Sequence, residues 1–277
     1  MSYVREPFEE LDVMNYFMFN KLTTTPETSE RFCRCMLKNL LGIEVGKVNI
    51  KAEQIELPDD PEKRGVRLDV AIEESAGGNI TSIYDIEPHR DFESSYPKKN
   101  RFTQAQIDKN LMKSGNNDFS KMPNLYIICI TNYDPFGYGR LLYTIKNQCV
   151  EAPDLVYNDG VKVLYFNTTG TIGGSEALSN FLKYLEESKS ANVVDDATKE
   201  IDDYVGVIKN NYAIGGKYMT VGDLIDKIVD EAVAEKEAEK DATIAGKDAT
   251  IAEKDATIAE RDARIAELEA QLSKIKK

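Results

Sequence analysis

Alternating apolar and polar residues predict a group of β-strands in the first two thirds of the chain. Within Val66–Glu73 every second residue is apolar, which is the period of a half-buried strand, and Asp69 falls on its polar face. Segment 80–87 has the same period and follows a turn containing Gly77 and Gly78, so the two segments predict a hairpin. Further strands are predicted at 48–57, 125–131, 141–145 and 161–166.

Apolar residues at helical spacing predict helices around these strands. The segments are 13–22, 30–41 with Gly42 as its stop, 97–114, 175–185, and 195–228 with a break at Gly215 and Gly216. Strands alternating with helices in this order predict an α/β fold.

A seven-residue repeat distinguishes the end of the chain. From Asp241 the units DATIAGK, DATIAEK, DATIAER and DARIAEL follow one another and place four isoleucines one heptad apart. This pattern predicts a long helix, either a weak coiled coil that joins copies of the chain or a solvated spacer without a partner. The expected organisation is a core domain at 1–190, a helical connector at 191–230, and a heptad-repeat helix or coiled coil at 231–277.

Composition and charge narrow the class of protein. The 277 residues are 42% apolar, which excludes wholesale disorder, and the longest apolar run, Leu125–Ile130, is too short to cross a membrane. The start of the chain lacks a secretory signal and the four cysteines show no CxxC spacing, so we expect a cytoplasmic protein with structural thiols. Because the net charge is −13, any contact with nucleic acid must be local.

Two carboxylates provide the candidate chemistry. A hairpin turn centred on Gly78 pairs residues whose numbers sum to 156, which places Asp69 opposite Glu87, about 5 Å apart. Two carboxylates this close favour a divalent cation between them, and Mg²⁺ is the simplest choice; a solvated acidic edge is the alternative. Pro88 is expected to end the strand, which would let His89 reach a metal-bound water, unless that histidine is simply a buried or surface residue.

Several blocks in one order give a specific resemblance. Asp69 in GVRLDV, Glu87-Pro88-His89 after YDI, RFTQ from Arg101, DPFG with GR, and NTTG together resemble the PD-(D/E)XK nuclease family transposases, relatives of the recombination-promoting nucleases, over residues 10–190. The resemblance implies a restriction-endonuclease-like core, in which a mixed four-stranded sheet is flanked by helices. It also implies a metal held by Asp69, Glu87 and the backbone carbonyl of Pro88.

The resemblance extends to the residues around the metal. His89 stands where the family has lysine or glutamine, and Gln104 stands where a polar residue faces the site and could assist catalysis. Arg101 could bind a phosphate, or form a surface salt bridge instead. DNA would be bound by the basic stretch of the third helix, which is otherwise a solubilising face: Lys98, Lys99, Arg101, Lys109 and Lys113.

Two functions follow from these observations. The first is a Mg²⁺-dependent DNA endonuclease, with Mn²⁺ as an alternative ion, linked to recombination or mobile elements. The second is a weakened or inactive nuclease fold that binds DNA or assembles through its tail. The sequence leaves open whether the nucleic acid is DNA or RNA, the target sequence, and whether strand transfer accompanies cleavage.

Overall fold

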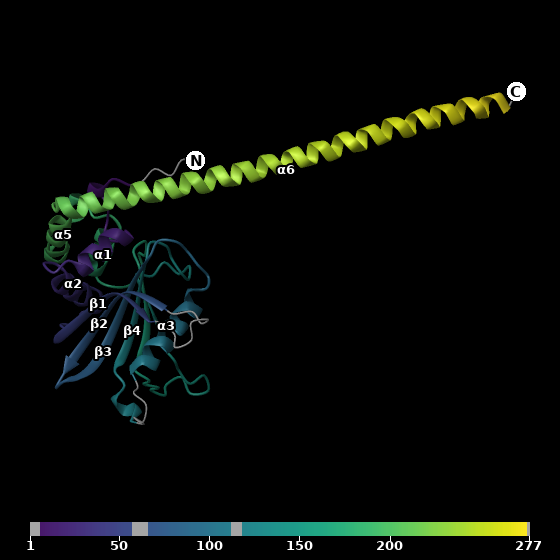
Figure 1. Cartoon of the computed structure of the whole chain (residues 1–277). Helices are drawn as coiled ribbons and strands as arrows, with labels where there is room; N and C mark the ends of the chain where they lie inside the picture. Colours follow the sequence, from purple (N-terminus) through teal and green to yellow (C-terminus); the bar gives the residue numbers. More distant parts are fainter. Residues whose placement is uncertain (1–5, 57–65, 112–117, 276–277) are drawn as a thin grey trace. The chain divides into compact units, whose positions relative to one another are not determined.

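The computed structural model describes residues 6–56, 66–111 and 118–275 of the chain, and it has a mixed six-stranded sheet at its centre (Figure 1). The strands lie in the order β1-β2-β3-β4-β6-β5, in which β3, β4 and β6 are parallel and the other pairs antiparallel. Their bounds are β1 Lys47–Glu56, β2 Val66–Ala76, β3 Asn79–His89, β4 Asn124–Thr131, β5 Leu142–Ile145 and β6 Val161–Asn167. The α/β class is confirmed, and the sheet has six strands where the resemblance implied four.

Helices cover both faces of this sheet. On one face, Ile72, Ile86 and Ile128 belong to a large apolar core with buried side chains from α1 Tyr16–Thr24, α2 Ser29–Leu41, α4 Glu176–Glu186 and α5 Asp196–Lys209. On the other face, Ala71 and Ile127 pack in a smaller cluster with Ile107 of α3 Tyr96–Leu111. This smaller cluster lies on the face that carries Asp85 and Glu87, because side chains alternate along a strand.

The ends of two helices test the sequence reasoning. Gly42 stops α2 as predicted, since it has a φ of 68° and its N–H donates to the carbonyl of Lys38. The break expected at Gly215 and Gly216 is wrong. The chain breaks earlier, where Asn211 accepts bonds from two backbone N–H groups and starts α6 Tyr212–Ile275, and Gly215 instead leaves room for the ring of Phe8.

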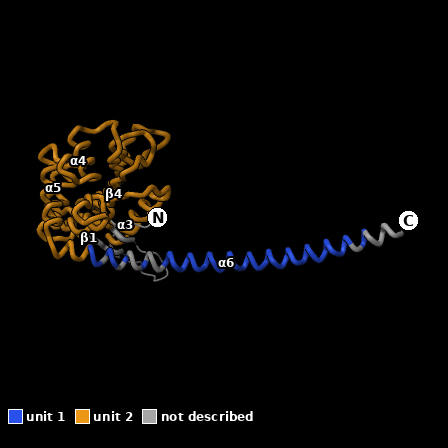
Figure 2. Tube along the Cα trace, turned by 90° about the horizontal axis from the view of Figure 1, so that it is seen from above, with its two compact units in different colours: residues 1–5, 219–277 blue, residues 6–218 orange. Residues whose placement is uncertain are grey.

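The chain divides into two compact units (Figure 2). Residues 6–218 form the globular unit, and residues 219–277 belong to the second. Helix α5, within the expected connector, contributes Ile201, Val205 and Ile208 to the globular core. No helix in the described part of the chain combines the length and the apolar character needed to cross a membrane.

Candidate functional site

The β2–β3 hairpin brings the predicted acidic residues to one face of the sheet. Described pairs run from Val70 opposite Ile86 to Glu74 opposite Ser82, so the predicted register is confirmed up to an irregularity after Glu74. Continued by one position, this register sets Asp69 opposite Glu87, and alternation places both on the face of Asp85. The turn residues Gly77 and Gly78 have φ values of 59° and 85°, which glycine adopts readily.

Two of these carboxylates are buried without full compensation. Asp85 has no exposed surface, and neither of its carboxylate oxygens has a hydrogen-bond partner. Burial, followed by the charges of Glu87 and Asp69, raises the pKa of Asp85 well above its usual value. Glu87 is 2% exposed, and its Oε1 likewise lacks a partner. The site therefore holds negative charge that the described side chains only partly balance.

Lys99 supplies the balancing charge. Its Nζ lies 2.7 Å from Oε2 of Glu87, and its side chain remains 40% exposed. Burial alone would lower the pKa of Lys99, but Glu87 and Asp69 outweigh that effect and raise it. An ammonium group on the first turn of α3 thus reaches from solvent to the buried carboxylate.

His89 lies on the same face but does not neutralise Glu87. Its Nε2 is 3.6 Å from Oε2 of Glu87, too far for a hydrogen bond, and it has no hydrogen-bond partner. Burial, followed by the charge of Lys99, lowers the pKa of His89 to about 3, so the ring is neutral at neutral pH. Its ring centre lies 4.1 Å from that of Tyr96.

The expectation that Pro88 ends the strand is wrong. β3 continues through His89, and both residues pair with β4, opposite Ile130 and Thr131. Proline removes one donor but leaves the neighbouring parallel bonds intact, so the ladder tolerates it here. His89 reaches the site because it stands two residues from Glu87 on an unbroken strand.

The remaining predicted residues lie on α3. Gln104 is half-buried, and its amide nitrogen is 3.4 Å from Oδ2 of Asp108 on the same helix. Lys98, Arg101 and Lys109 are exposed, while Lys113 lies outside the described residues. The inward face of the helix is instead formed by Asn100, Thr103 and Ile107. Lys99, from the basic stretch, contacts Glu87.

Two members of the site were missed or misassigned from the sequence. Asp85 has no role in the predictions from sequence, although its position two residues before Glu87 in a predicted strand places both side chains on one face. The sequence predicts Lys99 to be one of the exposed DNA-binding cations. Nothing in its spacing separates it from Lys98; only the packing of α3 on the sheet does.

The acidic side chains of the site offer the oxygen ligands that divalent cations such as Mg²⁺ prefer. Both carboxylate oxygens of Asp85 and Oε1 of Glu87 are hard, buried donors without a hydrogen-bond partner, and Asp69 lies next to them when the strand register is continued by one position. Within the described residues, no three or more His, Cys, Asp or Glu side chains are gathered as a ligand group. A cation here would therefore need a backbone oxygen or water beside the acidic pair.

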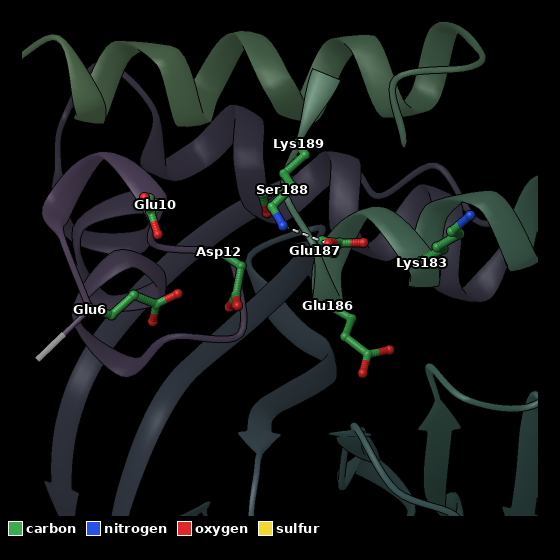
Figure 3. Close-up of a pocket in the computed structure, with 8 residues that line it drawn as sticks. All are labelled: Glu6, Glu10, Asp12, Lys183, Glu186, Glu187, Ser188 and Lys189. Carbon is green, nitrogen blue, oxygen red and sulfur yellow. Dashed lines mark hydrogen bonds and ion pairs between the residues drawn. The ribbon is translucent and has the colours of Figure 1, made fainter. Parts of the chain in front are cut away.

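The globular unit also contains a hollow with a different lining (Figure 3). It encloses about 420 Å³ and is lined by acidic residues with two lysines and a serine: Glu6, Glu10, Asp12, Lys183, Glu186, Glu187, Ser188 and Lys189. Burial raises the pKa of Asp12 to about 6, although the paired Arg90 opposes the rise. No predicted site residue lines this hollow.

Comparisons with protein-family models, curated sequences and solved structures found no match. The function is therefore inferred from the residues and their geometry.

Proposed function

We propose that the protein is a Mg²⁺-dependent DNA endonuclease of the PD-(D/E)XK transposase class, acting in the cytoplasm in recombination or on mobile elements. The observation that carries this proposal is the buried Glu87 carboxylate, with one oxygen on Lys99 and the other without a partner. Burying Glu87 beside Asp85, with Lys99 on only one of the four carboxylate oxygens, is costly, and this cost favours a function that needs negative charge at this place.

Each residue has a distinct part in the proposed reaction. Asp69 and Glu87 would hold the ion, together with the carbonyl of Pro88, and Mn²⁺ could replace Mg²⁺. A bound ion would lower the pKa of a water and offset charge on the phosphate. Neutral His89 would accept a hydrogen bond from that water and so orient it, since its Nε2 has no partner.

Lys99 would supply the positive charge that His89 cannot. Its Nζ is held at Glu87 while the side chain remains partly exposed, so it can donate to a phosphate oxygen beside the acidic residues. His89 occupies the position where the resembled family has lysine or glutamine. Lys99 of α3 would supply the positive charge in place of that lysine.

DNA binding would use Lys98, Arg101 and Lys109, which are exposed on the same helix, and Lys113, which lies outside the described residues. Since the chain as a whole repels polyanions, contact would be confined to this helix and its surroundings. Gln104 would assist only by giving up its contact with Asp108.

A second function is supported by a different observation. Lys99 already neutralises part of Glu87, and the described residues contain no group of three metal-ligating side chains. A chain that binds DNA or assembles through its tail without cutting is consistent with this arrangement.

Plasmid cleavage separates the two functions. With Mg²⁺ or Mn²⁺ the intact protein should nick plasmid DNA, and Asp69→Ala or Glu87→Ala should reduce the rate by roughly a hundredfold or more. Glu73→Ala is the matched control, because Glu73 lies on β2 like Asp69 but its carboxylate contacts Lys51 and Asn49. The nuclease proposal is rejected if both site variants cut as fast as the intact protein. It is also rejected if the intact protein neither cuts DNA nor binds Mn²⁺.

A further inference from the structure

The repeats of α6 leave one row of isoleucines at the surface. Ile244, Ile251, Ile258 and Ile265 are 48%, 55%, 54% and 53% exposed. They recur every seven residues, so they follow one slowly winding line along the helix. An exposed apolar row of this regularity favours a partner with the same period.

Opposite charges flank this row on its two sides. At about 100° per residue, the position three after each isoleucine lies roughly 60° to one side, and the position four after it lies about 40° to the other. The first position is basic in three repeats, as Lys247, Lys254 and Arg261. The second is acidic in all four, as Asp248, Asp255, Asp262 and Glu269.

The order of these rows distinguishes two arrangements of a helix pair. When two such helices lie parallel and in register, the basic row of each faces the acidic row of the other. When they are antiparallel, basic faces basic and acidic faces acidic. Three successive repeats carry the basic and the acidic residue on the same two sides, so each of them adds to the preference for the parallel pair.

We infer that α6 binds a second copy of this chain as a parallel, in-register two-stranded coiled coil with the isoleucine row at its seam. The partner is a second copy because it presents the same seven-residue period and the complementary charge rows. The acidic row makes a polyanion an unsuitable occupant. This inference does not depend on the proposed nuclease activity.

Disulfide trapping tests the orientation in the full chain. The background is Cys149→Ser, since Cys149 is the one cysteine that is not buried. On mild oxidation, Ile244→Cys and Ile265→Cys should each give a covalent dimer by itself, whereas Glu253→Cys, on the opposite side of the helix, should not. Cross-linking only when the two isoleucine variants are mixed would show an antiparallel pair and overturn the inference, as would no cross-linking at all.

Charge exchange tests the flanking rows by light scattering over a concentration series. Changing Lys247, Lys254 and Arg261 together to Glu should weaken the dimer at least tenfold and shift the mass toward the 31.1 kDa of one chain. Adding Asp248→Lys, Asp255→Lys and Asp262→Lys should restore the dimer, with circular dichroism confirming equal helix content. An unchanged mass in the first variant, or no recovery in the second, contradicts the proposed pairing.

Discussion

Asp85 lies in an environment that disfavours a charged carboxylate. It is fully buried, opposite Ala71, with two carboxylates nearby and no hydrogen bond to either of its oxygens. Its raised pKa means that the folded chain binds the proton more tightly than the unfolded chain does. Stability from this residue is therefore fully present below its ordinary pKa of 3.8 and is lost as the pH rises toward the folded-state pKa.

Replacing Asp85 by asparagine should stabilise the metal-free protein. Asp85→Asn keeps the shape but removes the buried charge, so we expect a gain of roughly 1–3 kcal/mol at neutral pH that shrinks toward pH 4. Urea unfolding in the presence of a chelator measures it. Glu73→Gln, on the partly exposed end of β2, should stay within about 0.5 kcal/mol of the parent. A loss of stability in Asp85→Asn at neutral pH would show that the charge is compensated.

His89 should produce the opposite pH dependence. Its pKa falls from 6.5 to about 3 on folding, so its contribution is fully present above pH 6.5 and is lost as the pH falls toward 3. The difference in stability between the parent and His89→Gln should therefore change by up to about 1.4 kcal/mol per pH unit in this window. Parallel stability curves from pH 4 to pH 7 would contradict the neutral, buried imidazole.

At the scale of elements, the hairpin and α3 differ in how far sequence predicts them. The β2–β3 register follows from local information, because two glycines fix the turn and strand alternation then assigns every face. The placement of Lys99 on Glu87 depends on how α3 packs across the sheet, which no local pattern contains. Likewise, the sequence indicates a break at Gly215, whereas the side chain of Asn211 caps the start of α6.

Neighbouring lysines on α3 should behave differently. Lys99→Met removes the partner of a buried carboxylate, so we expect cleavage to be lost. The free energy of unfolding should fall by about 1–2 kcal/mol, a modest loss because solvent screens the partly exposed lysine. Lys98→Met changes an exposed cation and should only weaken DNA binding, with the salt slope reduced by about 1. Chemical denaturation measures the change in stability, and DNA binding at several salt concentrations measures the salt slope. Equal behaviour of the two variants would contradict a role for Lys99 in the site.

At the scale of the whole molecule, we expect the globular unit to determine stability and the heptad repeats of α6 to determine assembly. Tyr218 closes the globular unit: its hydroxyl donates to the carbonyl of Glu6 at 2.7 Å, and its ring centre lies 5.6 Å from Phe8 and 5.0 Å from Phe17. These contacts attach the first turns of α6 to the globular core. The heptad repeats lie beyond them.

Truncation should therefore leave the globular unit intact. A chain ending at residue 231 keeps Tyr218, and its unfolding midpoint should stay within about 2 °C of the full chain at low protein concentration. Tyr218→Ala in the full chain should instead lose roughly 3 kcal/mol, because it vacates a ring-lined site. Scanning calorimetry distinguishes them, and a large drop on truncation would show that the repeats support the core.

The ion pair between Lys99 and Glu87 links the two ligands of the proposed enzyme. If Lys99 moved toward a phosphate, Oε2 of Glu87 would become available to a cation, and a cation held there would free the ammonium group for the phosphate. By thermodynamic reciprocity, nucleic acid would then raise the affinity for metal by the same factor by which metal raises the affinity for nucleic acid. A chain that met neither of the two would keep Glu87 neutralised by Lys99.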